Sequence, residues 1–289
     1  MTKGQKLREI LSNPGILVLP GVHDCVSVKL AEKSGFQVAF TSGFGISAAM
    51  LGRPDFGYLT ATEMLWSVSR IIQSVDIPII VDIDTGYGNP LNVIQTVEEI
   101  VRIGAGGIIL EDQEWPKKCG HFEGKRVIAM DEHVEKIRAA VHARGDSGLV
   151  IVGRTDSRAS HGLDDAIERG HEYYKAGADI VFVEAPQSVE ELKEIASAFE
   201  QVPLLANMVE GGKTPFLSTE ELEHLGYKIV VYGLSGLFSA TKAMESCFKR
   251  LKENGTTEGF DEMLSFKDFE EVMDTAKYRE MEDKFKAQS

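Results

Sequence analysis

Short runs of aliphatic and β-branched residues alternate with longer amphipathic segments along the whole chain. Eight of these runs have the length and composition of buried strands. They span residues 16–19, 37–41, 79–82, 108–111, 150–153, 180–183, 203–206 and 229–232. Strands that alternate with helices form a parallel sheet covered by those helices, so eight units in series predict a closed (β/α)8 TIM barrel.

The segments between the runs carry helix signals. The expected helices cover residues 24–34, 60–74, 91–103, 131–144, 163–175, 188–200 and 219–225. Ser188 and Ser218 are each followed three residues later by glutamate, which is the capping-box spacing at a helix start. Glycine ends several of these segments just before the next strand, where a left-handed cap is needed.

Beyond the eighth run, the pattern predicts more helix than one barrel requires. Residues 239–254 read as a long helix, 255–259 as a break and 266–287 as a further charged helix. The surplus predicts packing on a neighbouring subunit, and a solvated tail folded on its own barrel is the alternative. Because no low-complexity linker interrupts the chain, we expect one barrel domain over residues 1–289 with a C-terminal helical extension over 239–289.

Composition narrows the choice of partners and compartment. The formal net charge of −14 disfavours nucleic acid and anionic membranes as partners. The N-terminus is charged and amphipathic, and no apolar run approaches the roughly 18 residues of a membrane helix. The three cysteines are far apart and never form a CxxC pair, which fits a reducing compartment. We therefore expect a cytoplasmic protein that acts on small molecules.

Carboxylates gather where two neighbouring strands are expected to end. Asp82 and Asp84 close the third run, and Glu111 and Asp112 close the fourth. The C-terminal ends of barrel strands carry function, and hard oxygen ligands suit magnesium. Any one of these acids could instead pair with Arg154 or cap a helix. Four acids on two adjacent strand ends favour the metal.

The turn after the second run has the sequence Ser-Gly-Phe-Gly over residues 42–45 and opens toward a helical segment. Its backbone amides could bind a carboxylate or an enolate oxygen. An ordinary βα turn can need the same glycines, so this pattern alone does not decide between the two readings.

Residues 112–130 form a longer loop than most βα connections, which predicts lid behaviour. The loop holds a cluster of basic residues, namely Lys117, Lys118, His121, Lys125 and Arg126. We expect this cluster to favour the thiolate of Cys119, which makes Cys119 a candidate acid, base or nucleophile. An inert loop cysteine is the alternative, and Cys25 and Cys247, in expected helices, are interpreted as packing residues.

The motif Lys117-Lys-Cys-Gly-His121 occurs together with Asp82-x-Asp84-x-Gly-x-Gly88 and Glu111-Asp-Gln113. This combination resembles the isocitrate lyase and phosphoenolpyruvate mutase superfamily over nearly the whole chain. The K-[KR]-C-G-H motif marks the carbon–carbon lyase branch of that superfamily. The chain length is similar to that of its short lyases, which include methylisocitrate lyases, 2,3-dimethylmalate lyases and petal-death-type enzymes.

The resemblance implies roles for individual positions. The implied catalytic residues are Cys119, His121 and Arg154. The implied substrate-binding residues are Ser42, Gly43, Phe44, Gly120, Arg154, Glu184 and Asn207. The implied ligands of magnesium, or of manganese in its place, are Asp82, Asp84 and Glu111. The resemblance also implies a homotetramer whose eighth helix is exchanged between subunits.

Departures from the methylisocitrate lyase pattern bear on the substrate. Phe238 and Lys267 align with two arginines of those enzymes, the first of which binds an additional carboxylate, and Asn207-Met-Val-Glu-Gly-Gly212 also differs. A buried phenyl ring cannot pair with a carboxylate, so a smaller and less charged substrate is expected.

The expected function is therefore magnesium-dependent retro-Claisen cleavage of 2,3-dimethylmalate to pyruvate and propionate. His121 and Glu184 are both candidates for the base that removes the hydroxyl proton. The alternatives are a methylisocitrate lyase that releases succinate and pyruvate, a phosphonomutase-like isomerase, and a non-catalytic metabolite-binding barrel.

Overall fold

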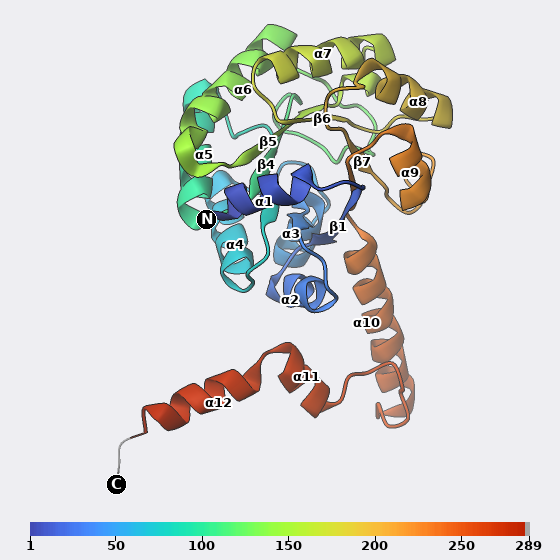
Figure 1. The fold of residues 1–289 in the computed structure, drawn as a ribbon. Helices are drawn as coiled ribbons and strands as arrows, with labels where there is room; N and C mark the ends of the chain where they lie inside the picture. Colours follow the sequence, from blue (N-terminus) through green and yellow to red (C-terminus); the bar gives the residue numbers. More distant parts are fainter. Residues whose placement is uncertain (287–289) are drawn as a thin grey trace.

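Eight parallel strands surround a common axis in the computed structural model, which describes residues 1–286 (Figure 1). Neighbouring strands pair in the order β6-β5-β4-β3-β2-β1-β8-β7, and a bridge between Val181 and Leu204 joins the two ends of that series. The strands are β1 (Leu17–Val22), β2 (Ala39–Thr41), β3 (Ile79–Asp82), β4 (Gly107–Glu111), β5 (Val150–Thr155), β6 (Ile180–Val183), β7 (Leu205–Asn207) and β8 (Ile229–Tyr232). The predicted (β/α)8 barrel is confirmed.

Helices cover the outside of the barrel. They are α2 (Cys25–Lys33), α3 (Gly43–Leu51), α4 (Ala61–Gln73), α5 (Pro90–Ile103), α6 (Met130–Arg144), α7 (Leu163–Lys175), α8 (Val189–Ala198) and α9 (Thr219–Leu225), with short 3-10 turns η1 (Gly145–Ser147) and η2 (Ser157–Ala159). The predicted helices did not include α1 (Lys3–Ser12), and α3 was expected only as a helical segment of unstated length after the turn of residues 42–45. Thr2 and Gln5 form a capping box that begins α1, and its Leu7 is fully buried in the barrel interior.

Each strand divides its apolar residues between two layers. In β3, Ile80 belongs to the barrel interior, whereas Ile79 and Val81 pack against the surrounding helices. In β4, Ile109 faces the interior and Ile108 faces the helices. Successive side chains of a strand point to opposite faces, so this alternation also fixes which polar residues at the strand ends face the barrel axis.

The chain leaves the barrel after β8. Helix α10 (Ser235–Asn254) projects away from it, and α11 (Phe266–Val272) and α12 (Thr275–Lys284) lie beyond (Figure 1). The single helix expected over 266–287 is wrong, because Asp274 adopts a left-handed backbone with φ of +54° and separates α11 from α12. Residue 287 lies outside the described residues.

The Asp274 carboxylate ties this extension back to its own barrel. Its two oxygens lie 2.8 Å from Nζ of Lys29 and 2.7 Å from Nζ of Lys33, both on α2. The extension nevertheless leaves many large apolar side chains in solvent, including those of Met244, Phe248, Leu251, Phe266 and Phe269.

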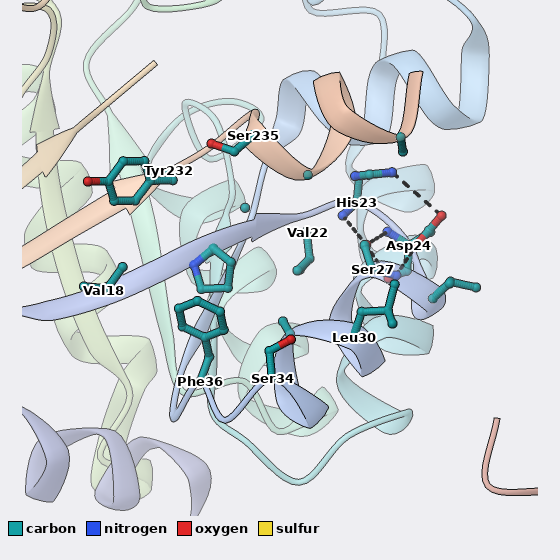
Figure 2. Close-up of a pocket in the computed structure, with 16 residues that line it drawn as sticks. Val18, Val22, His23, Asp24, Ser27, Leu30, Ser34, Phe36, Tyr232 and Ser235 are labelled. Atoms are coloured by element: carbon teal, nitrogen blue, oxygen red, sulfur yellow. Dashed lines mark hydrogen bonds and ion pairs between the residues drawn. The ribbon is translucent and has the colours of Figure 1, made fainter. Parts of the chain in front are cut away.

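An apolar groove lies on the outer face of the barrel between α2 and the first turns of α10 (Figure 2). Its volume is about 590 Å³, and Val22, Leu30, Phe36, Tyr232 and Ala240 contribute to its lining. A helix that covered the eighth strand would pack here, but α10 turns away instead. Within residues 1–286, no helix combines the length and apolar character needed to cross a membrane.

Candidate active site

The alternation of side chains along the strands brings polar groups from five strands to one end of the barrel axis. Each of these groups comes two residues after an interior apolar residue, as Asp82 follows Ile80 and Glu111 follows Ile109. The inward-facing set is Asp82, Glu111, Arg154, Glu184 and Asn207. A cavity at this end is lined by four of the set and by Ser42, Phe44, Cys119, Gly120 and His121, which the sequence had also selected.

Asp82 and Asp84 stand side by side at the end of β3. The Asp82 carboxylate accepts two backbone hydrogen bonds. The Asp84 N–H donates to Oδ1 of Asp82 at 3.1 Å, and the Gly43 N–H donates to Oδ2 of Asp82 at 3.3 Å. Lys117 reaches in from the loop, with Nζ 2.6 Å from Oδ1 of Asp84 and 2.8 Å from Oδ2 of Asp55. Burial disfavours the Lys117 ammonium, but the surrounding carboxylates outweigh burial and raise its pKa.

The residues at this strand end fit a divalent cation. Burial raises the pKa of Asp84 to about 7 and that of Glu111 well above its usual range, despite the nearby Lys117 and Arg154. Oε1 of Glu111 is a buried oxygen without a hydrogen-bond donor among residues 1–286. Such clustered, underpaired carboxylates are stabilised by a cation.

A pair of carboxylates at one strand end is compatible with magnesium. In the part of the chain that the structure describes, no three His, Cys, Asp or Glu side chains are close enough to surround a metal by themselves. Magnesium commonly binds one or two carboxylates and keeps several waters, so Asp82 and Asp84 are sufficient as direct ligands. Glu111, which contacts Arg154 instead, would act from farther away.

Asp112 faces away from the cavity, and its expected place among the metal-binding acids is wrong. Its carboxylate accepts hydrogen bonds from the Thr155 hydroxyl at 2.7 Å, the Tyr173 hydroxyl at 2.7 Å and the Asp156 N–H at 2.8 Å. Arg169 lies 3.2 Å away. These contacts join β4, β5 and α7, so Asp112 has a structural role.

Arg154 occupies the centre of the polar end of the barrel. Its Nε lies 2.8 Å from Oδ2 of Asp156, and its Nη2 lies 3.3 Å from Glu111 and 3.4 Å from Glu184. Burial opposes its charge, but Asp156, Glu111 and Glu184 together raise its pKa, so the guanidinium stays charged. A planar, permanently charged group in this position suits a substrate carboxylate or a developing keto acid.

The loop over residues 112–130 folds across the cavity. Its two ends form a short antiparallel pair, in which Gln113 bridges Val127. Nearer the tip, the Gln113 amide both donates to the Lys118 carbonyl at 2.8 Å and accepts from its N–H at 3.0 Å. The Cys119 N–H donates to the Asp55 carbonyl at 3.1 Å. These contacts hold the tip of the loop, Cys119 to His121, against the strand ends.

Cys119 does not have the favoured thiolate that the sequence predicted. Burial raises the pKa of its thiol to about 11, and the nearby Asp55 and Glu184 carboxylates act in the same direction. Lys117 opposes the shift, but its ammonium is engaged by carboxylates. Lys125 is bound to Asp156. The thiol is therefore protonated at neutral pH, as a proton donor must be.

His121 is oriented by the loop after β7. Its Nδ1 accepts a hydrogen bond from the Lys213 N–H at 3.0 Å, so a neutral ring carries its proton on Nε2. Nε2 lies 3.2 Å from Oε1 of Glu184 and 3.5 Å from Nδ2 of Asn207. Burial would raise the pKa of Glu184, but Arg154 and His121 lower it. Glu184 is therefore ionised at neutral pH and can accept a proton.

Gly120 has no room for a side chain. A Cβ on Gly120 would lie 2.5 Å from Nη2 of Arg154 and 2.6 Å from Cδ of Glu184. The loop backbone can therefore approach these two groups only because residue 120 is glycine. Ser42 caps α3 by accepting from the Gly45 N–H at 3.2 Å, so the turn of residues 42–45 is a helix start beside Asp82.

Sequence reasoning missed Asp55 and did not predict the partners of three other charged residues of this site. Asp55 lies in the loop after α3, with neither a strand end nor a motif to mark it. Lys117 and Lys125 had been assigned to a loop cluster around Cys119, whereas each is buried against a carboxylate from another element. Asp156 follows β5 directly and was found at that strand end from the sequence, but its pairing with Arg154 and Lys125 was not predicted.

Comparison with known proteins relates this geometry to a family. The family model for phosphoenolpyruvate phosphomutase matches residues 7–252. The chain is 45% identical over 282 residues to the petal death protein of Dianthus caryophyllus, covering 97% of this chain and 88% of that protein. It is 45% identical over 285 residues to 2,3-dimethylmalate lyase of Eubacterium barkeri, covering 98% of each.

Solved structures agree with the sequence relatives. A structure of oxaloacetate acetylhydrolase in complex with the inhibitor 3,3-difluorooxalacetate superposes with a TM-score of 0.94 at 33% identity, covering 100% of this chain and 98% of that one. A structure of phosphonopyruvate hydrolase in complex with oxalate and Mg²⁺ gives a TM-score of 0.89 at 30% identity, covering 99% of each. The chain belongs to the phosphoenolpyruvate mutase and isocitrate lyase superfamily.

Proposed function

We propose that the protein is a magnesium-dependent carbon–carbon lyase that cleaves 2,3-dimethylmalate to pyruvate and propionate. One observation carries the proposal: the Cys119 thiol and the Asp82 carboxylate border the same cavity. A thiol beside a metal site can protonate a carbanion, which is the step that a lyase needs after the bond breaks. The 45% identity to a 2,3-dimethylmalate lyase supports the same reaction.

The side chains divide the reaction between them. Magnesium on Asp82 and Asp84 would supply positive charge for the C1 carboxylate and the 2-oxygen. Glu184 takes the hydroxyl proton, the C2–C3 bond breaks, and C2 becomes the ketone carbon of pyruvate. The electron pair of the broken bond goes to the other fragment as an enediolate.

Cys119 completes the reaction by transferring its thiol proton to C3 of that fragment, which gives propionate. The proton taken from the hydroxyl restores the thiol, so the reaction consumes no water. Arg154 and the amides of the α3 N-terminus stabilise the keto acid as its charge develops.

The cavity favours a dicarboxylate with alkyl groups over a tricarboxylate. It is small, about 50 Å³, and Phe40, Phe44, Val209 and Leu234 form its apolar side. Of its cations, Arg154 and Lys117 are already bound to protein carboxylates, and Nζ of Lys118 donates to a backbone carbonyl at 3.2 Å. A third substrate carboxylate would therefore have to compete for a partner.

The structure places Phe238 and Lys267, two residues on which the expected substrate specificity depended, outside the cavity lining. Phe238 is not the buried ring that was expected, because it lies on the first turns of α10 with 41% of its surface exposed. Lys267 is exposed on α11 and contributes nothing to the cavity lining. In their place, Leu234 closes the cavity beside β8. The residues that disfavour a third carboxylate are therefore those of the cavity lining, and Phe238 is not among them.

A substrate comparison tests the proposal. We expect kcat/KM for 2,3-dimethylmalate to exceed that for methylisocitrate by at least about tenfold, because an unpaired buried carboxylate costs more than that factor. Pyruvate release is followed with magnesium and after its removal with a chelator, alongside oxaloacetate cleavage and phosphonopyruvate rearrangement. Equal or faster cleavage of methylisocitrate would contradict the substrate assignment, and phosphonopyruvate rearrangement without pyruvate release would contradict the lyase assignment.

We also propose that the protein assembles with further copies of itself, as a homotetramer with an exchanged α10. The exposed apolar residues of the extension and the groove between α2 and α10 support this, since both present unpartnered apolar surface (Figure 2). Light scattering on the purified chain is expected to give a multiple of 31.8 kDa. A mass of one chain at micromolar concentration would contradict the assembly.

A further inference from the structure

Lys125 is a buried cation in an otherwise exposed part of the loop. Its side chain is 1% exposed, and its Nζ lies 2.7 Å from Oδ1 of Asp156 and donates to the Gly120 carbonyl. The next residue, Arg126, has a side chain that is 79% exposed and pairs with Glu114 at 2.7 Å on the surface. Two neighbouring cations of one loop thus have opposite environments.

Asp156 connects Lys125 to the floor of the site. The same carboxylate binds Nε of Arg154 at 2.8 Å and its Nη2 at 3.1 Å. The Asp156 N–H donates to Oδ1 of Asp112 at 2.8 Å, which fixes its backbone to β4. A rigid anion at the end of β5 is therefore shared between the loop and the guanidinium that would hold the substrate.

Lys125 also contacts the loop tip directly, because its ammonium donates to the Gly120 carbonyl. Gly120 lies between Cys119 and His121, and a Cβ on Gly120 would collide with Arg154 and Glu184. The ammonium of Lys125 binds this carbonyl and Asp156 at once, so it spans the gap between tip and floor. The tip has other contacts as well. The Cys119 N–H donates to the Asp55 carbonyl, and the His121 ring contacts Glu184 and the Lys213 N–H.

We propose that Lys125 is a positioning residue, whose ion pair with Asp156 latches the loop of residues 112–130 over the cavity and sets Gly120 and Cys119 against Arg154. Its importance for catalysis rests on the proposed function, whereas its effect on loop closure does not. Without the ammonium, the Gly120 carbonyl and Asp156 lose their common partner, and the loop opens more often. Ligand binding then includes the cost of closing it.

The loop contains a natural reporter of its own closure. Trp115 is one of two tryptophans in the chain, 46% exposed, and its ring packs edge-on against Tyr87 at 6.0 Å between centroids. The other, Trp66, is 58% exposed on α4 and can be replaced by phenylalanine. In a Trp66→Phe background, acrylamide quenching of fluorescence reports the exposure of the loop alone.

The test compares Lys125→Met with the matched control Arg126→Met in that background. We expect Lys125→Met to raise the quenching constant about twofold without ligand, and saturating magnesium and oxalate to restore it. The apparent Kd for oxalate should rise about tenfold and kcat should fall about tenfold to a hundredfold, because the closed state is less populated. Arg126→Met should leave all three quantities unchanged, since its pair is solvated.

The outcomes separate the latch from the proposed function. If Lys125→Met had the same quenching constant and the same oxalate affinity as the parent, the latch would be overturned, even if pyruvate release fell. If the parent cleaved none of the tested acids while Lys125→Met still showed the quenching change, the latch would stand and the lyase assignment would fail. Should Lys125→Met not fold, Lys125→Gln retains a donor for the Gly120 carbonyl and is expected to give intermediate values; parent-like values would overturn the latch.

Discussion

Replacing Cys119 with alanine is expected to lower kcat for 2,3-dimethylmalate by about 10²- to 10⁴-fold, the range that a positioned general acid contributes. The thiol borders the cavity, and its raised pKa, about 11, keeps it protonated across the neutral range. Oxalate affinity in the presence of magnesium should stay within about threefold, because the ligand contacts lie on the strand ends. Steady-state rates and oxalate titration measure the two effects.

Matched controls come from the other cysteines. Cys25 and Cys247 are free thiols in α2 and α10, away from the cavity lining, so Cys25→Ala and Cys247→Ala should keep parent turnover. Cys119→Ser should resemble Cys119→Ala, since a hydroxyl is a far weaker acid than a thiol. Near-parental turnover in Cys119→Ala with intact oxalate binding would rule out the acid role.

Replacing Arg154 with methionine is expected to damage both stability and turnover. Its guanidinium is the shared partner of Asp156, Glu111 and Glu184, and removing it leaves three buried carboxylates without that cation. Loss of one member of a buried ion pair costs about 3–5 kcal/mol, so the free energy of unfolding should fall by about that amount. Denaturant unfolding measures it, and kcat/KM should fall at least about a thousandfold.

Arg154→Lys distinguishes charge from geometry at this position. An ammonium preserves the positive charge but cannot bind Asp156 through two nitrogens as the guanidinium does. We expect Arg154→Lys to recover much of the stability and little of the activity. If Arg154→Met unfolded at the parental denaturant concentration and still bound oxalate, Arg154 would be neither the structural centre nor the substrate ligand.

The apolar pattern predicted the barrel because buried parallel strands are nearly continuous apolar runs, which few other structures share. It did not give the bounds of α3, whose sequence begins with Gly-Phe-Gly and has poor intrinsic helix propensity at that end. Helix α1 was missed because its principal core contact, Leu7, is a single residue in a charged segment. In both cases tertiary packing decides the structure, and local propensity does not.

The site was partly accessible from the sequence for the same reason. Residues at strand ends, such as Asp82 and Arg154, could be found because the strands that carry them could be found. The apolar run did not separate Glu111 from Asp112, because both faces of β4 are apolar and the run does not show which residue faces the axis; only the family resemblance selected Glu111. The prediction that Lys117 would favour the Cys119 thiolate relied on their closeness in sequence. Lys117 is two residues from Cys119, but its ammonium binds Asp55 and Asp84.

Product analysis in deuterated water tests the central claim most directly. An equimolar mixture of 2,3-dimethylmalate and methylisocitrate is incubated with the protein and magnesium in D₂O and followed by nuclear magnetic resonance. The account predicts that pyruvate and propionate appear first and in equal amounts, with one deuterium at C2 of propionate delivered by the exchanged Cys119 thiol. Succinate appearing first, or propionate without deuterium at C2, would contradict it.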